Sequence, residues 1–181
     1  ASLKASLNLP KTSFPLQSAP TVVEPQLVSL LSIENYKRQA AERAEQPPFV
    51  LHDGPPYANG DLHMGHFLNK VLKDVVNRWQ LLNGRRVHFV PGWDCHGLPI
   101  ELKALQTSGA DAAHQLPALE LRACAAACAT DAISSQREAF LRWGIMADWE
   151  APYYTMQPAY EAAQLGVLRA MLRRGLIFRG A

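Results

Sequence analysis

Between residues 49 and 90 the sequence alternates a short apolar run, a loop, a long helical pattern and a second apolar run. The runs 49–52 and 87–90 are predicted to be strands. From 63 to 83 the residues repeat with a helical period, and Gly84 stands where a C-terminal cap is expected. Two strands joined through one helix run parallel, with a right-handed crossover. The sequence therefore predicts an α/β fold built on a parallel sheet.

The predicted helix at 63–83 has two distinct faces. Its polar face includes Lys70, Lys73 and Arg78, which we expect to be solvated, with RNA contact as a less favoured role. The other face is apolar and consists of Leu68, Val71, Leu72, Val75, Val76, Trp79 and Leu82.

Further elements are predicted on both sides of this unit. Residues 1–23 form a proline-punctuated lead-in, and residues 24–43 a helix with a partial apolar stripe at Leu27, Leu30, Leu31 and Tyr36. Helices are expected at 117–143 and 158–174, and a new strand at 176–179. We therefore divide the chain into an irregular and helical N-terminal extension, 1–46, and the first portion of an α/β domain, 47–181.

The composition is that of a globular protein. The 181 residues are 48% hydrophobic and 19% charged, with a formal net charge of +2 that does not by itself indicate nucleic-acid binding. No apolar run approaches the roughly 20 residues of a membrane-spanning helix. Three cysteines suggest a reducing compartment rather than a disulfide framework. Cys124 and Cys128 share a helix face, and we expect them to be buried packing residues rather than metal ligands.

The helix pattern begins at His63-Met64-Gly65-His66, directly after the glycine- and proline-rich loop 53–61. A helix N-terminus offers free backbone N–H groups and the positive end of the helix dipole, which suit a phosphate chain. Gly65 allows a ligand to approach the backbone closely, and the two imidazoles, three residues apart, lie on one face. The sequence thus predicts a phosphate site here.

Other phosphate and metal motifs fit this element less well. Gly60 and Gly65 have the glycine spacing of a Walker A loop, but His66 and Phe67 replace its Lys and Ser/Thr. No G-x-G-x-x-G sequence follows a predicted strand. A zinc site at His63 and His66 stays an alternative, although no third ligand lies nearby in the sequence.

Several ordered motifs resemble one family. Residues 53–66, DGPPYANGDLHMGH, are similar to the "HIGH" element of class I aminoacyl-tRNA synthetases, and most of all to their isoleucine branch. Residues 68–74 and 91–101 also match that branch, as do residues 8–15 and 142–149. The resemblance covers nearly the whole chain and implies a Rossmann-like catalytic domain.

The resemblance also implies an activity: ATP-dependent activation of isoleucine to isoleucyl-adenylate, followed by transfer to tRNA(Ile). ATP would enter as its Mg²⁺ complex, with no protein-bound metal in this segment. The amino-acid site would comprise Gly54, Pro55, Asp94 and His96, with Asp94 binding the substrate ammonium group. The ATP site would comprise Pro56, Tyr57, Asn59, Gly60, His63, Gly65 and His66, of which His63 and His66 are the expected catalytic residues. The full-length protein is expected to be a monomer without membrane association.

One element of the family is missing from the sequence. No Lys-Met-Ser-Lys-Ser-like loop, the family's second ATP element, occurs in these 181 residues. We expect the chain to end before an editing insertion and to be inactive alone. Two alternatives remain: a non-catalytic binding or regulatory protein with part of a synthetase fold, and an enzyme of the wider HIGH-containing group. The amino-acid sequence of residues 142–149 favours a location in the mitochondrial matrix, with the bacterial cytoplasm as the alternative.

Overall fold

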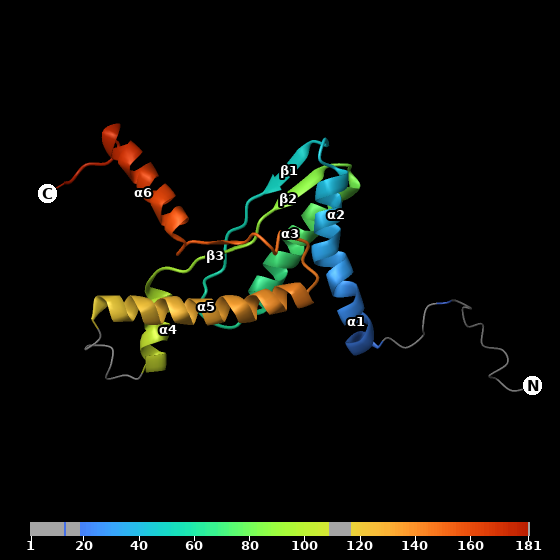
Figure 1. The fold of residues 1–181 in the computed structure, drawn as a ribbon, viewed down its shortest axis with the longest axis horizontal. Helices are drawn as coiled ribbons and strands as arrows, with labels where there is room; N and C mark the ends of the chain where they lie inside the picture. The colour runs from blue at the N-terminus through green and yellow to red at the C-terminus, as the bar shows by residue number, and fades with distance from the viewer. Residues whose placement is uncertain (1–12, 14–18, 109–116, 181) are drawn as a thin grey trace, which may run out of the picture.

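The structure, a computed structural model, describes residue 13 and residues 19–108 and 117–180. The motif at residues 8–15 and most of the predicted lead-in lie outside the described residues, apart from residue 13. The predicted β–α–β unit is confirmed: β1 (Pro48–Leu51) and β2 (Arg86–Phe89) pair in parallel, and α3 (Met64–Leu82) connects them (Figure 1). Each strand begins one residue before its predicted start.

A second parallel ladder, which the sequence did not predict, extends the unit. The strands β3 (Gly92–Trp93) and β4 (Tyr153–Tyr154) pair residue for residue. Gly92 is required at this crossing, because a Cβ there would lie 2.1 Å from Cζ of Tyr153. The ladder brings the segment after β2 together with a segment sixty residues later in the chain.

The N-terminal helix runs from residue 20 to residue 42 in three stretches: α1 (Pro20–Ser29), the π-helical turn η2 (Leu30–Glu34) and α2 (Asn35–Glu42). It begins four residues before its predicted start, at a proline that fits the first helical turn. Tyr36 is buried, but the rest of the predicted apolar stripe is exposed. Gln39 fixes α2 to β2, since its amide exchanges hydrogen bonds of 2.8 and 2.9 Å with the Val87 backbone.

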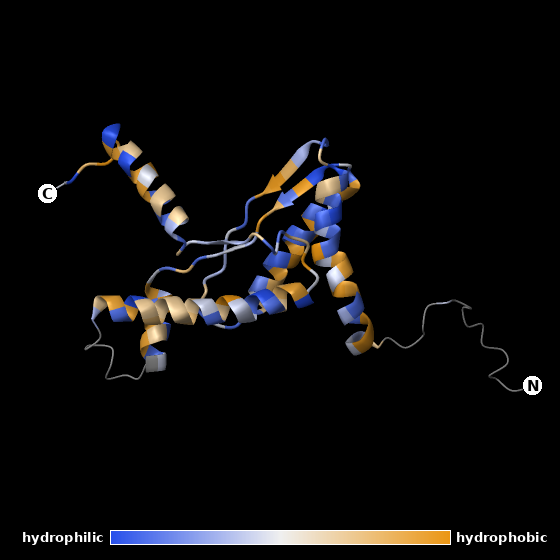
Figure 2. Ribbon diagram, viewed as in Figure 1, coloured by the Kyte–Doolittle hydropathy of each residue, from blue (hydrophilic) through white to orange (hydrophobic). Residues whose placement is uncertain are grey.

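Three helices follow β3 in the chain, with β4 between the second and the third. Helix α4 (Leu98–Ser108) packs against α5 (Ala118–Arg142), while α6 (Pro158–Arg173) stands apart from the other helices (Figure 1). Apolar residues recur along α6, and none of its side chains is buried (Figure 2). The prediction of a strand at 176–179 is wrong: the segment is irregular, because no strand pairs with it among the described residues. No described helix combines the length and apolarity needed to cross a membrane.

Aromatic side chains fill the centre of the molecule. Trp93 is completely buried and packs against Phe140, Trp149 and Tyr154, with ring centroids 5.7 to 6.4 Å apart. Phe89 at the end of β2 is equally buried. Phe89, Trp93 and Tyr154 are the last residues of β2, β3 and β4, so their packing fixes the points at which the following loops begin.

The orientation of α3 contradicts the prediction of a solvated polar face. Lys70 and Asn77 are buried, and neither amide atom of Asn77 has a hydrogen-bond partner in the described residues. Arg78 donates to the carbonyls of Leu31 and Gly144, each at 2.9 Å. The exposed face is instead the apolar one, represented by Leu68, Leu72, Val75, Val76, Trp79 and Leu82. The helical period identifies two faces, and tertiary contacts decide which of them turns inward.

Candidate functional site

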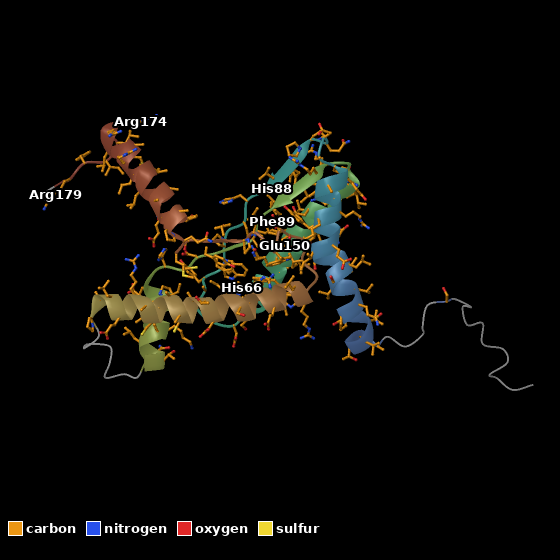
Figure 3. The ribbon with its side chains drawn as sticks, in the orientation of Figure 1. His66, His88, Phe89, Glu150, Arg174 and Arg179 are labelled. Carbon is orange, nitrogen blue, oxygen red and sulfur yellow. The ribbon has the colours of Figure 1, made fainter. Side chains whose placement is uncertain are left out.

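The first turn of α3 is closed by its own two histidines. His63 is the N-cap, and its Nδ1 accepts a hydrogen bond of 3.0 Å from the Gly65 backbone N–H. In return, His66 Nδ1 accepts from the His63 N–H at 3.2 Å. The ring centroids lie 4.0 Å apart, and Figure 3 marks His66 in the middle of the molecule. The structure therefore brings the two predicted phosphate ligands together.

This cap selects the tautomer of each neutral ring. An Nδ1 atom that accepts a hydrogen bond carries no proton, so each neutral ring holds its proton on Nε2. Neither Nε2 has a partner within the described part of the chain. Partial burial, together with the nearby His63 and Lys70, lowers the pKa of His66 and so favours its neutral form. The turn presents two Nε2–H donors, a pattern that suits anionic oxygen atoms.

Gly65 is required for this geometry. A Cβ at residue 65 would lie 2.8 Å from Cε1 and 3.0 Å from Nδ1 of His63. The imidazole would have to move away, and the bond to the Gly65 N–H would break. In this structure Gly65 makes room for the His63 ring, in addition to any ligand that the N-terminus receives.

Loop 53–61 and loop 94–97 are joined directly. Asp94 N–H donates to the Pro56 carbonyl at 2.9 Å, and Ala58 N–H donates to the Asp94 carbonyl at 2.9 Å. These bonds form an isolated parallel bridge between Tyr57 and Asp94. Residues predicted to bind ATP and residues predicted to bind an amino acid therefore lie side by side, although about forty residues separate them.

The Asp94 carboxylate is half-buried and held in place from two sides. Its Oδ1 accepts from the His96 N–H at 3.3 Å and from the Thr155 hydroxyl at 3.4 Å. That hydroxyl in turn accepts from the Cys95 N–H at 2.8 Å. The His96 ring lies with Nε2 at 3.1 Å from the Thr155 carbonyl, so it holds the loop. A fixed, half-exposed carboxylate can pair with a cationic ligand.

Loop 53–61 begins with a buried ion cluster, formed by Asp53, Lys70 and Lys73. The Asp53 carboxylate is fully buried and accepts from both ammonium groups, with Lys73 Nζ at 2.5 Å. Lys70 also lies over the Phe140 ring, at 5.0 Å from its centroid. Burial lowers the pKa of Lys70, while Asp53 opposes that shift. The cluster ties the start of the loop to α3 and leaves one positive charge in excess.

The other predicted site residues lie along the same loop. Gly54, Tyr57 and Asn59 are exposed, Pro55 and Gly60 are half-buried, and Pro56 is buried. A Cβ at Gly54 would meet no atom within 4 Å, so open space adjoins the backbone there. A cavity of about 550 Å³ opens beside loop 94–97, with Cys95, His96, Ile100, Arg122 and Glu161 among its lining residues.

Two residues that hold these loops were missed in the sequence. Thr155 binds loop 94–97, and Gln136 of α5 binds loop 53–61 through the carbonyls of Tyr57 and Gly60. Gln136 had a detectable signal, since it is a lone polar residue on the stripe of α5 that contains Ala129, Ile133 and Phe140, all buried. Thr155 had none, because its position depends on the β3–β4 pairing.

The described residues contain no group of three or more His, Cys, Asp and Glu side chains that could bind a metal ion. Cys124 and Cys128 are free thiols on α5 and are half-buried rather than fully buried as expected. Cys95 is buried.

Comparison with known proteins places this geometry in a family. A family model described as tRNA synthetases class I (I, L, M and V) matches residues 30–181. An isoleucine–tRNA ligase of Parasynechococcus marenigrum is 51% identical over 179 residues, which are 99% of this chain and 18% of that protein. The chloroplastic/mitochondrial isoleucine–tRNA ligase of Arabidopsis thaliana is 48% identical, over 98% of this chain and 16% of that protein.

A solved structure shows the same fold. The LeuRS of Agrobacterium radiobacter K84, in a ternary complex with tRNA and LeuAMS, superposes with a TM-score of 0.71 at 26% identity. The match covers 91% of this chain and 19% of that chain. The chain thus spans less than a fifth of the length of these relatives.

Proposed function

The chain belongs to the class I tRNA synthetases (I, L, M and V), and from this premise we propose that it forms part of an isoleucine–tRNA ligase. The identity of about half to isoleucine–tRNA ligases, over nearly the whole chain, supports isoleucine as the substrate. In this reaction isoleucine and ATP give isoleucyl-adenylate and pyrophosphate. The acyl group then passes to tRNA(Ile), and AMP is released.

The ATP phosphates bind at the first turn of α3. The isoleucine carboxylate attacks the α-phosphorus, so the protein contributes mainly alignment and stabilisation of charge on phosphate oxygens. Two Nε2–H donors, on His63 and His66, and the free N–H groups of the helix N-terminus provide that stabilisation. Pro56, Tyr57, Asn59 and Gly60 line the same nucleotide site from loop 53–61.

The isoleucine ammonium group pairs with Asp94. A charged group in a partly dry pocket needs a fixed counter-charge, and the Asp94 carboxylate is held by His96 and Thr155 for this purpose. Gly54 and Pro55 line the side-chain pocket. The observation that carries the proposal is the Tyr57–Asp94 bridge, because it sets the two substrate sites next to each other.

The proposal is tested by amino-acid-dependent ATP–pyrophosphate exchange with the full-length protein. We expect exchange with isoleucine, and much less with valine or leucine. Replacing Asp94 with Asn should raise the KM for isoleucine more than the KM for ATP. Exchange that is driven best by another amino acid, or no exchange at all, would refute the proposal.

The 181-residue chain is proposed to be inactive alone, since it spans less than a fifth of its relatives and contains no Lys-Met-Ser-Lys-Ser-like loop. Isoleucine-dependent exchange by the isolated chain would contradict this. ATP is proposed to enter as its Mg²⁺ complex, and EDTA should abolish exchange.

We propose the mitochondrial matrix as the location, because the similar Arabidopsis thaliana enzyme is chloroplastic/mitochondrial. Imaging of the tagged full-length protein tests this. We also propose that the full-length protein is a monomer, and its molecular mass in solution tests this.

A further inference from the structure

Gln136 of α5 links loop 53–61 to Trp93, the residue that precedes loop 94–97. Its Nε2 donates to the Gly60 carbonyl at 2.7 Å and to the Tyr57 carbonyl at 3.1 Å, both in loop 53–61. Its Oε1 accepts from the indole N–H of Trp93 at 3.0 Å. Trp93 immediately precedes Asp94. A single side chain from α5 therefore contacts loop 53–61 and the residue that leads into loop 94–97.

The burial of Gln136 makes these bonds specific. The residue is 2% exposed and lies between the apolar residues Ile133 and Phe140 on its helix. Transfer of an amide out of water is costly unless hydrogen bonds replace those to water. Two of the bonds go to loop 53–61 and the third to Trp93, the residue before loop 94–97, so the cost of burying this amide is offset only when both segments are in place.

We propose that Gln136 is a positioning residue that keeps loop 53–61 and loop 94–97 in fixed relation, and with them ATP and isoleucine. This inference rests on the proposed function. Gln136 does not touch a substrate. It acts through Gly60, three residues before His63, and through Trp93, next to Asp94.

Alignment of the reacting atoms explains why such a residue would matter. In-line attack on the α-phosphorus requires the carboxylate oxygen to be held about 3–3.5 Å from the phosphorus in the correct direction, and a misplacement of about 1 Å can cost ~100-fold in rate. The Tyr57–Asp94 bridge joins the loops at one point. Gln136 adds one contact to each of the two bridged segments, at Gly60 in loop 53–61 and at Trp93 before Asp94. These contacts keep the two segments from rotating relative to each other about the bridge.

The test compares three variants of the full-length protein in ATP–pyrophosphate exchange. Gln136→Met keeps the length of the side chain but removes all three bonds, and should raise the KM for ATP and for isoleucine, lowering kcat/KM about 10- to 100-fold. Trp93→Phe keeps an aromatic ring in the core and, of the three bonds to Gln136, removes only the one beside Asp94. It should raise the KM for isoleucine and leave the KM for ATP unchanged. Gln39→Met is the matched control, because Gln39 is a buried glutamine bonded to the backbone of Val87, away from both loops.

A purely structural role would give a different result. If Gln136→Met only reduces the folded fraction, kcat per total enzyme falls while both KM values stay unchanged, as expected for Gln39→Met. That result would overturn the proposal, as would a rise in only one KM for Gln136→Met. If Gln136→Met does not fold, Trp93→Phe decides: an unchanged KM for isoleucine overturns the proposal.

Hydrogen exchange provides a readout that needs no activity. Gln136→Met should speed exchange in both loop 53–61 and segment 92–97, and Gln39→Met in neither. Unchanged protection of the loops in Gln136→Met would refute the positioning role. If the unmodified protein shows no isoleucine-dependent exchange of pyrophosphate, the proposed function fails, and the loop-protection measurement still tests Gln136 separately.

Discussion

Replacement of Asp53 by Asn should destabilise the folded state strongly. Asp53 is the carboxylate of the buried cluster, and Lys70 and Lys73 both donate to it. Asn has nearly the same shape but no charge, so the change leaves two ammonium groups without their anion. Lys73, with 19% of its side chain exposed, can reach water, whereas Lys70, with 4%, cannot. The cost therefore falls mainly on Lys70.

The size of that cost is bounded on both sides. Breaking a buried ion pair by removing one partner costs about 3–5 kcal/mol. Lys70 can avoid an unpaired charge by losing its proton, which at pH 7 and from the ordinary pKa of 10.5 costs at most ~5 kcal/mol. Burial already lowers the pKa of Lys70, so the true cost lies below that ceiling. We expect about 3–4 kcal/mol, decreasing as the pH rises.

Lys70→Met should be much milder, because Asp53 keeps Lys73 and the methionine packs against the rings of Phe89 and Phe140. The double variant Asp53→Asn/Lys70→Met should recover most of the loss. Lys37→Met is the control; it breaks an exposed ion pair with Glu150 and should cost less than ~1 kcal/mol.

The assay is hydrogen exchange of peptides from α3 and β2 in the full-length protein. A loss of 3–4 kcal/mol speeds exchange of the most protected amides by roughly 150- to 1,000-fold. The reasoning is refuted if Asp53→Asn speeds exchange less than about fivefold, or if the double variant is no better than Asp53→Asn.

Three further predictions concern other parts of the structure. Gly65→Ala should displace the His63 ring and raise the KM for ATP about tenfold, with the KM for isoleucine unchanged; an unchanged KM for ATP contradicts it. Burial, assisted by the charge of Asp53, raises the pKa of Tyr153 to about 12, so the folded state keeps this proton while the unfolded state loses it above pH 10. Stability should fall between pH 10 and 12, and Tyr153→Phe should remove part of that fall and one late phenolate from the absorbance titration. The isolated chain should bind a hydrophobic dye at the exposed face of α3, and Leu72→Glu with Trp79→Glu should reduce the binding several-fold with unchanged helix content.

The helices α3, α5 and α6 and the first two strands could be predicted because their signals are local, whereas the bounds of α4 were not predicted. The helices α3, α5 and α6 begin at residues 64, 118 and 158, each within one residue of the predicted start. Pro117 and Pro158 mark two of these starts, since proline is favoured at the beginning of a helix. The segment 176–179 shows the limit of such signals. Its apolar run fits a strand, but a strand forms only when another strand pairs with it.

The interior face of α3 could not be predicted from its period. The pattern separated polar from apolar residues correctly, but Lys70, Asp74 and Arg78 turn inward because they have partners far along the chain. Asp74, for example, accepts from the Met146 N–H at 2.8 Å, seventy-two residues away. A polar face is expected to be solvated only when no such partners exist, and a single sequence does not reveal them.

The two loops of the candidate site share one structural plan. Each follows the carboxyl end of a parallel strand: Asp53 comes two residues after β1, and Asp94 directly after β3. In each case the aspartate is fixed by side chains from a different element, Lys70 of α3 for the first and Thr155 after β4 for the second. The first aspartate is buried and holds the chain, while the second is half-exposed and free to meet a cation. The same residue type at the ends of two parallel strands thus has a structural role in one loop and the proposed ligand-binding role in the other, and burial distinguishes the two.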